Sequence, residues 1–342
     1  MIYFITTNSK VTQAKRRLTF DQHAPVSLQH CGKADVLSYI VNGKPANEYQ
    51  FPWMVQLQMR IAGDPDYYVC GGTIITKLHV LTAAHCFDVE GKEVISIDVL
   101  YGHVDWRRAK KPHRSVRTSR RFVSGDSTDR SQQKVSDPFP QLAMRGIAMS
   151  GGGTEIAAIY IIYGHADISR AARVKVAKLL RHPQYDDKSL FNDIAVLLVE
   201  KPFQYGLEVK PICFPTKPLN AYNKNAVIAG WGKLSEFGNT SDYLQFTIVK
   251  IQPNEVCEKI YLDSYRSDKT YCAFRNNTSP CFGDSGSPLF LLTSKKLYVQ
   301  VGIVSHGFSC ESPVVYAKVE SFIDWVGNAT RSLKGYRDLA RR

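Results

Sequence analysis

A chain of 342 residues that is 44% apolar and 22% charged has the composition of a folded globular protein, which excludes a disordered one. No apolar run approaches the roughly 20 residues that a membrane-spanning helix requires, and the longest candidate covers 156–163. The net charge of +13 would suit a polyanionic partner, so the position of the basic residues along the chain matters.

The N-terminus and the cysteines give different indications about export. Residues 1–5 are apolar, but polar and basic residues follow at once, so this end lacks the apolar core of a signal peptide. The eight cysteines are even in number and scattered rather than clustered in CxxC pairs. This pattern favours four disulfides in an oxidising compartment over a zinc site. We therefore expect a secreted, extracellular protein whose export signal is missing from this sequence or unusual.

Short apolar segments separated by Gly, Asp and Pro predict an all-β protein. Many short strands without alternating helices indicate a sandwich or barrels. One helix is expected near the end, where Phe322, Ile323 and Val326 fall at helical spacing. The predicted strands are 53–59, 73–82, 161–165, 174–180, 194–199, 227–231, 244–251, 287–292, 298–304 and 314–319.

A seven-residue pattern occurs twice at a separation of 62 residues, as 99–105 and 161–167. Between the copies lie eight Lys and Arg over Arg107–Arg121 and then a polar stretch without helix or strand periodicity. We expect an insertion over about 104–160, either a disordered surface loop or a duplicated or retained non-coding segment. Only one copy is expected to pair into a sheet. The second is the better candidate, because it runs directly into 174–180.

Three short motifs supply the groups that a nucleophilic catalyst needs. Ser285 lies between two glycines, which permits a tight turn and leaves backbone N–H groups free to face an oxyanion. His85 follows one apolar strand, and Asp193 lies at the mouth of another. A serine hydroxyl needs an imidazole to take its proton, and the imidazole needs a carboxylate to fix its tautomer. Each residue alone has an ordinary structural reading, but together they indicate a catalytic triad.

With Thr82–Cys86, Asn192–Leu198 and Gly283–Pro288 in this order, the chain resembles the chymotrypsin-like serine peptidases. The resemblance covers about 40–326 apart from the insertion. Further matching residues are Ile40-Val41-Asn42-Gly43, Gly230-Trp231-Gly232, Ser305-His306-Gly307 and Trp325. The resemblance implies an all-β fold of two packed six-stranded antiparallel β-barrels with a C-terminal helix. The implied parts are a prosegment over 1–39, a peptidase domain over 40–334 with barrels over about 40–215 and 216–320 and a helix over about 320–334, and a basic tail over 335–342.

The resemblance also implies a role for each site residue. His85 is the general base and then the general acid, Asp193 orients it, and Ser285 attacks the substrate carbonyl. The backbone N–H groups of Gly283 and Ser285 form the oxyanion hole. The implied substrate-binding residues are Ser279, Pro280, Phe282, Ser305, Gly307 and Val314. The implied disulfides are Cys31–Cys213, which tethers the prosegment, Cys70–Cys86, Cys257–Cys272 and Cys281–Cys310.

Activation is implied to follow a cut before Ile40. In this family the new α-amino group pairs with the acid before the nucleophile, here Asp284, so the resemblance implies a zymogen. Tyr39 precedes the cut instead of Arg or Lys, and a trypsin-like activator is not expected to cleave there. Either a chymotrypsin-like or other peptidase activates the chain, or activation is impaired, or the junction lies elsewhere.

The pocket for the residue before the scissile bond is expected to be apolar and shortened. Ser279 stands where trypsin-like relatives have Asp, so a basic side chain would lose its hydration without compensation. Gly307 keeps one wall open, but Val314 stands where roomy pockets have Gly. Leu, Met, Val or Ala should fit better than Trp. Two further departures from the family are Ser287 in place of a glycine and His306 in place of a tryptophan.

The expected partners are protein or peptide substrates, an activating peptidase and a protein inhibitor, with no nucleic acid, no membrane span and a monomeric state. No metal-ligand spacing, phosphate loop or nucleotide fingerprint occurs, so no cofactor or metal is expected. Glycosylation triplets begin at Asn239, Asn276, Asn277 and Asn328. Two alternatives stay open: a catalytically silent homologue that binds or regulates other proteins, and a polyanion-binding protein that uses Arg107–Arg121.

Overall fold

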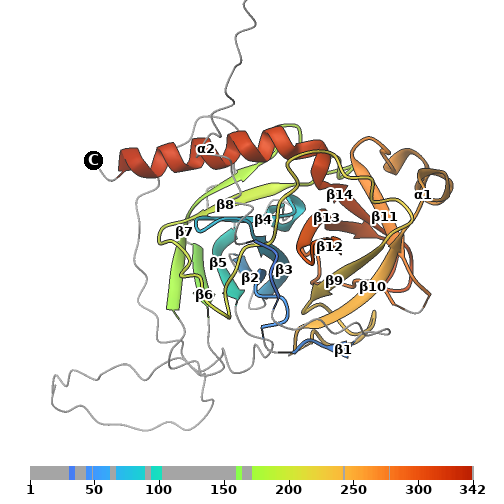
Figure 1. Cartoon of the computed structure of the whole chain (residues 1–342), viewed down its shortest axis with the longest axis horizontal. Coiled ribbons are helices and arrows are strands. Elements are labelled where there is room, and N and C mark those ends of the chain that lie inside the picture. The colour runs from blue at the N-terminus through green and yellow to red at the C-terminus, as the bar shows by residue number, and fades with distance from the viewer. Residues whose placement is uncertain are drawn as a thin grey trace, which may run out of the picture.

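The computed structural model places two β-barrels side by side, with one long helix lying across the first (Figure 1). This arrangement confirms the expected all-β class with a C-terminal helix. The structure describes residues 31–34, 44–47, 49–61, 67–88, 94–101, 159–163, 172–241, 243–276 and 278–340.

The first barrel is a closed ring of seven described strands in the order β2-β3-β4-β8-β7-β6-β5. Antiparallel pairing of β2 with both β3 and β5 closes the ring. Strand β8 is buried along its whole length and is a continuous apolar run, which is typical of a strand covered on both faces. The strands are β2 (Met54–Ile61), β3 (Tyr67–Ile74), β4 (His79–Thr82), β5 (Val94–Tyr101), β6 (Ile159–Tyr163), β7 (Ala172–Arg181) and β8 (Ala195–Val199).

Both copies of the repeated pattern enter this barrel. Strands β5 and β6 run parallel, with Val99 opposite Ile161 and Tyr101 opposite Tyr163. The expectation that only one copy pairs into a sheet is therefore wrong, and the barrel has seven strands where six antiparallel ones were expected. Both copies are rich in β-branched and aromatic residues, and the intervening segment exceeds the roughly dozen residues that a parallel crossover needs. Of the expected insertion, about 104–160, only Ile159 and Tyr160 are described, at the start of β6, and 104–158 lie outside the described residues.

Because the similar strands β5 and β6 pair with each other, we predict that the barrel can close with only one of them. Deleting 101–162 joins Leu100 to Tyr163, leaves a single strand between β2 and β7, and shortens the His85 to Asp193 separation from 108 to 46 residues. We expect the variant to keep its β-sheet circular dichroism and a single cooperative thermal transition, with a net charge lowered to +7 because the segment carries 11 basic and 5 acidic residues. Loss of the cooperative transition would show that the barrel needs both strands.

The second barrel is closed by a direct pairing of β9 with β10. Its described strands follow the order β10-β11-β14-β13-β12-β9, and the short strand β1 is added to the outer edge of β10. All of these pairings are antiparallel. The strands are β1 (Lys44–Pro45), β9 (Asn225–Gly230), β10 (Gln245–Ile251), β11 (Thr270–Phe274), β12 (Pro288–Leu292), β13 (Tyr298–Gly307) and β14 (Val314–Lys318).

Helix α2 (Ile323–Ala340) crosses the first barrel over β8 (Figure 1). Its buried residues Val326, Ala329 and Leu333 recur every three or four positions, which places them on one face. The helix follows a 3₁₀ turn, η5 (Val319–Phe322), and continues into the predicted tail. The other described helices are η1 (His85–Phe87), α1 (Asn254–Tyr261) and η4 (Leu262–Ser264). Within the described part of the chain, no helix is long and apolar enough to cross a membrane.

A cluster of aromatic side chains joins the two barrels. Trp53 of the first barrel is fully buried and lies edge-on to Phe290 of the second, with ring centroids 5.5 Å apart. Phe51 contacts Phe246 and Phe290 in the same way, at 5.2 and 5.3 Å. Each such pair contributes about 0.5–1.5 kcal/mol beyond burial. The cluster fixes one barrel against the other, and so fixes the side chains of one barrel relative to those of the other.

Candidate active site

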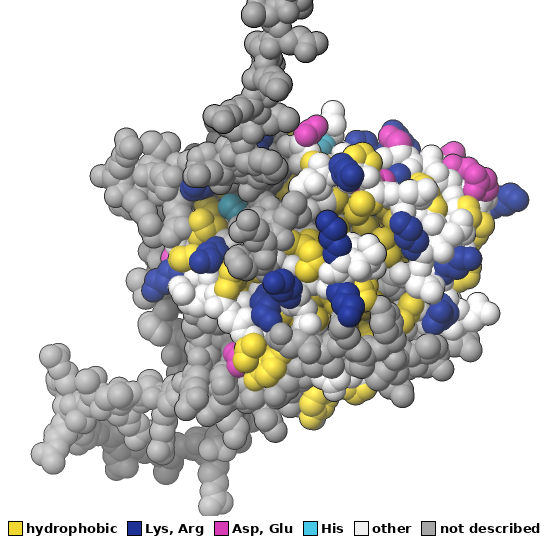
Figure 2. All heavy atoms as spheres, in the orientation of Figure 1, with side chains coloured by type: hydrophobic (Ala, Val, Ile, Leu, Met, Phe, Trp, Pro, Cys, Tyr) yellow, Lys and Arg dark blue, Asp and Glu magenta, His cyan; other side chains and the backbone are white. Residues whose placement is uncertain are grey.

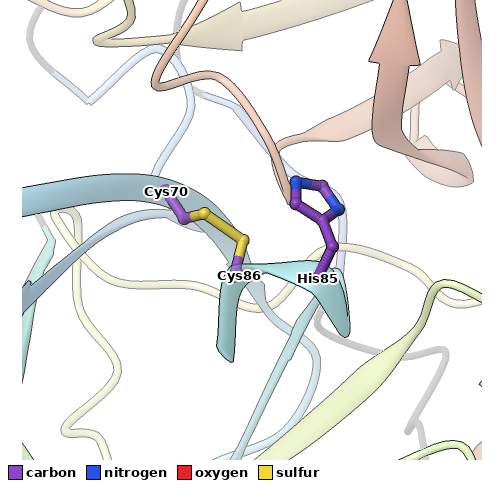
Figure 3. A group of neighbouring side chains, drawn as sticks. All are labelled: Cys70, His85 and Cys86. Carbon is purple, nitrogen blue, oxygen red and sulfur yellow. A yellow bond between two sulfur atoms is a disulfide. The ribbon is translucent and has the colours of Figure 1, made fainter. Parts of the chain in front are cut away.

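His85 projects from a turn between the barrels. The buried strand β4 leads into Ala83 and Ala84, whose small buried side chains allow the chain to turn tightly into η1. A disulfide between Cys70 of β3 and Cys86 anchors this turn to the barrel. Figure 3 shows the imidazole of His85 and the disulfide leaving the same turn next to each other. The turn that carries His85 is therefore held by a covalent bond as well as by packing.

Asp193 is the buried partner of His85. Its side chain is 1% exposed, and its backbone follows Asn192, whose positive φ of 56° is one that asparagine tolerates well. Oδ2 of Asp193 is 2.7 Å from Nδ1 of His85, and Oδ1 accepts the His85 backbone N–H at 2.9 Å. The hydroxyl of Ser305, from the second barrel, donates to Oδ2 at 2.6 Å. Three donors from two barrels thus fix this carboxylate.

These contacts set the charges of the pair. Burial alone would raise the pKa of Asp193, but the neighbouring His85 and the hydrogen bonds more than offset it and hold the pKa below its ordinary value. Burial would likewise lower the pKa of His85, but the charge of Asp193 outweighs it and raises the pKa above its ordinary value. The carboxylate is therefore ionised at neutral pH, and the imidazole is a stronger base than a free histidine.

Ser285 lies in a glycine-rich loop that packs against the His85 turn. Gly283 and Gly286 have φ values of +94° and +80°, which only glycine adopts without strain. A Cβ on Gly286 would lie 2.2 Å from Oγ1 of Thr82, so this close approach also requires glycine. The carbonyl of Ser285 accepts the N–H of Gly71 at 2.6 Å, which ties the loop to β3. Among the described residues no hydrogen bond joins the Ser285 hydroxyl to His85, and such contacts often shorten only when substrate binds.

Asp284 points into the second barrel rather than toward the nucleophile. Its carboxylate accepts the backbone N–H groups of Gly232 at 2.7 Å and Cys281 at 3.0 Å. Burial raises the pKa of Asp284 to about 6, although these two hydrogen bonds act in the opposite direction. Within the described residues no Lys, Arg or His forms an ion pair with it. Its predicted partner Ile40 lies outside the described residues.

The predicted pocket residues lie together beside this loop. Ser279 donates its hydroxyl to the carbonyl of Ser312 at 3.0 Å, so it is already engaged. Val314 is 3% exposed, and a Cβ on Gly307 would lie 3.1 Å from its Cγ2. The Cys281–Cys310 disulfide joins the two walls. An apolar side chain therefore fills the space that a glycine at position 314 would leave open.

Of the remaining predicted pocket residues, Phe282 is 57% exposed. Nζ of Lys233 lies over its ring, 5.7 Å from the ring centroid. Pro280, two residues before Phe282, is buried. The sequence indicates Ser305 only as a substrate-binding residue, whereas the structure gives it a direct hydrogen bond to Asp193. Nothing local in the sequence shows that Gly71 and Thr82 lie against the Ser285 loop.

The eight cysteines form the four disulfides that the resemblance implied. Cys31–Cys213 fixes the short segment 31–34 against the second barrel, where Gly32 donates to the carbonyl of Pro211. The close grouping of Cys70, Cys86 and His85 has the residue types of a metal site. Because its two sulfurs are bonded to each other, it offers no thiolate to a metal.

Comparison with known proteins agrees with this geometry. The family model of Trypsin matches residues 40–137 and 157–326. The venom peptide isomerase heavy chain of Agelenopsis aperta is 28% identical over 84% of this chain and 98% of its own length. A venom protease of Bombus pensylvanicus is 29% identical over 83% and 96%. The clotting factor G beta subunit of Tachypleus tridentatus is 26% identical over 95% and 88%.

A solved structure, "Structure of GrC", has a similar fold. Its TM-score is 0.59 at 21% identity, and the match covers 85% of this chain and all of that one. Since the identity is low, this likeness supports the two-barrel fold alone. The only internal gap in the family match, 138–156, falls within the expected insertion.

Proposed function

This chain belongs to the trypsin family of serine peptidases, and on that basis we propose that it is a serine endopeptidase with His85, Asp193 and Ser285 as its catalytic triad. The observation that supports the triad best is the buried pair of His85 and Asp193, whose Nδ1 and Oδ2 are 2.7 Å apart. The carboxylate requires the Nδ1–H tautomer of His85, which leaves Nε2 free to take a proton.

In the first half of the reaction, the Ser285 oxygen attacks the scissile carbonyl carbon as Nε2 of His85 takes its proton. The carbonyl oxygen becomes an oxyanion, and the backbone N–H groups of Gly283 and Ser285 donate to it. The tetrahedral intermediate collapses when His85 returns the proton to the leaving nitrogen. The C–N bond breaks, the amine leaves, and an acyl ester remains on Ser285.

In the second half, a water molecule takes the place of the leaving amine. His85 removes its proton while the water oxygen attacks the ester carbon, and the same N–H groups stabilise the second oxyanion. Collapse returns the proton to the Ser285 oxygen and releases the carboxylic acid. Asp193 stays ionised throughout and stabilises the imidazolium each time that it forms.

Labelling with a fluorophosphonate, before and after limited chymotryptic treatment, tests this proposal. The reagent forms a stable phosphonyl ester only with a serine that its own histidine activates, so one label per molecule on Ser285 is expected after treatment. If the chain is cut at the Tyr39–Ile40 bond, stays folded and takes no label, the result would instead support the catalytically silent homologue.

We further propose that the chain is a zymogen whose switch is Asp284. Burial without a cationic partner is unfavourable for a carboxylate, and an α-ammonium group freed at Ile40 would supply the missing charge. Pairing would fix the loop that carries Gly283 and Ser285. Because Tyr39 precedes the junction, a peptidase that cuts after aromatic residues is the proposed activator.

For the residue before the scissile bond, we propose a preference for medium apolar side chains. Val314 fills part of the pocket, and the Ser279 hydroxyl is held by the carbonyl of Ser312. Among the described residues, no acid lies at the pocket base to pair with Lys or Arg, and burying such a charge alone is unfavourable. Leu, Met, Val and Ala suit the remaining space.

A peptide library is expected to show cleavage after Leu, Met, Val or Ala, at least about tenfold more often than after Arg or Lys. Val314→Gly should widen the preference toward Phe and Tyr, because it removes the side chain that lies against Gly307. Ser279→Asp alone should not create a good site for Arg, since Val314 still shortens the pocket. Dominant cleavage after basic residues by the wild-type enzyme would contradict this assignment.

The relatives and the four disulfides favour an extracellular location, where protein substrates, an activating peptidase and a protein inhibitor are the proposed partners. The alternative of polyanion binding through Arg107–Arg121 rests on residues outside the described ranges. In Figure 2 the Lys and Arg side chains on the visible face of the second barrel are dispersed rather than gathered in one stripe. Salt-sensitive retention on heparin that disappears on deletion of 101–162 would favour that alternative as a second activity.

A further inference from the structure

His306 is linked to the His85–Asp193 pair through one residue, Ser305, by hydrogen bonds. Its Nδ1 is 3.2 Å from the hydroxyl of Ser305, and that hydroxyl is 2.6 Å from Oδ2 of Asp193. The same carboxylate oxygen is 2.7 Å from Nδ1 of His85. Four side chains therefore form one continuous chain of hydrogen bonds, which crosses from β13 of the second barrel to the η1 turn of the first.

The proton positions in this chain follow from its donors and acceptors. An ionised carboxylate only accepts, so the single proton of the Ser305 hydroxyl points to Asp193. The Ser305 oxygen can then only accept from His306, which requires a proton on Nδ1 of that ring. Burial lowers the pKa of His306, which agrees with a neutral ring that carries this one proton. Its other nitrogen, Nε2, is buried with no hydrogen-bond partner in the part of the chain that the structure describes.

The ring of Tyr261 packs against the His306 ring. Tyr261, at the end of α1, meets the ring edge to face with centroids 5.8 Å apart and an interplanar angle of 89°. The Tyr261 hydroxyl donates to the carbonyl of Pro313, and its ring stacks on Phe308 at 4.8 Å. Because Nε2 has no hydrogen-bond partner among the described residues, it does not hold the ring in place and its burial is unfavourable. The ring is held by its packing on Tyr261 and by the hydrogen bond of Nδ1 to Ser305.

We propose that His306 is a positioning residue for the triad, and that it acts through Ser305 rather than on the substrate. Its Nδ1–H holds the Ser305 hydroxyl on Asp193, and the hydroxyl in turn fixes the carboxylate against His85. Linked hydrogen bonds polarise one another, so the donor on His306 strengthens the bond from Ser305 to Asp193. This inference rests on the proposed function, because it assigns His306 a part in the same site.

A double-mutant cycle with His306→Phe and Ser305→Ala tests the inference. Phe keeps a ring against Tyr261 but has no Nδ1–H, so kcat is expected to fall about fivefold with KM little changed. His306→Asn, whose side-chain N–H can replace Nδ1–H, should restore most of that loss. In the Ser305→Ala background, His306→Phe should have no further effect on kcat, because the residue through which it acts is gone.

The proton NMR resonance of Nδ1–H of His85 gives a readout that needs no turnover. We expect His306→Phe and Ser305→Ala to shift this resonance in the same direction, and the double variant to match Ser305→Ala alone. Equal effects of His306→Phe on kcat in both backgrounds, or a loss of thermal stability with kcat and the resonance unchanged, would overturn the inference. If His306→Phe does not fold, His306→Leu takes its place in the cycle. A folded wild-type protein without turnover would count against the proposed function, while the resonance shifts still test His306.

Discussion

The Ser285→Ala variant is expected to fold like the parent protein and to lose turnover by a factor on the order of 10⁶. The reason is that the Ser285 oxygen forms the bond to the substrate carbon, and no neighbouring group can take its place. Substrate binding should change little, so the loss should appear in kcat rather than in KM. Steady-state kinetics on an activated sample, with the transition temperature measured beside it, checks both halves of the expectation.

Ser287 provides a matched control for this substitution. Its side chain is fully buried two residues further along the same loop, and its hydroxyl has no hydrogen-bond partner in the described structure. Removing an unpartnered buried hydroxyl is close to neutral for stability, so Ser287→Ala should keep both fold and turnover. A Ser285→Ala variant that keeps more than about a hundredth of the wild-type kcat would exclude Ser285 as the nucleophile.

The fold class could be predicted from the sequence, and the proposed site residues could be selected from it, because each motif is local. The apolar run 194–199 predicts a buried strand, and it directly places Asp193 at the end of that strand. The glycines around Ser285 predict a turn for a conformational reason, and Gly283 and Gly286 do have positive φ values. Such signals depend on a residue and its neighbours in the chain, so one sequence is enough to read them.

The parts that could not be predicted depend on contacts between distant segments. Both copies of the repeat are good strands, and nothing within either copy shows that β2 and β7 leave room for two. The hydrogen bond from Ser305 to Asp193 spans 112 residues and two barrels, so only the assembled structure reveals it. The same holds for Gly71, which must lack a side chain because Oγ of Ser287 lies 1.9 Å from where its Cβ would be.

Replacing Asp193 with asparagine is expected to lower kcat by about 10⁴ while the fold is kept. Asp193 accepts the His85 backbone N–H, the Ser305 hydroxyl and Nδ1–H of His85. An asparagine has one carbonyl oxygen, and its amide must donate where the second carboxylate oxygen accepted. If the amide faces His85, the imidazole must accept at Nδ1 and carry its proton on Nε2. That tautomer cannot take the proton of Ser285, so the base is lost while the shape of the site stays.

The pH dependence of His85 separates this explanation from a merely distorted site. The charge of Asp193 holds the pKa of His85 above 6.5 against burial, which acts to lower it. Wild-type kcat/KM should therefore fall as the pH drops through a value above 6.5, as Nε2 becomes protonated. In Asp193→Asn the contributions of Asp193 that raise the pKa of His85 are gone and burial, the largest influence, still lowers it, so NMR should show a lower pKa for His85 than in the wild type. Asp88→Asn is the matched control, because the exposed carboxylate of Asp88 also raises the pKa of His85 but makes no hydrogen bond to the His85 side chain. This variant should keep nearly full turnover. An unchanged His85 titration in Asp193→Asn would show that Asp193 does not set the charge of the base.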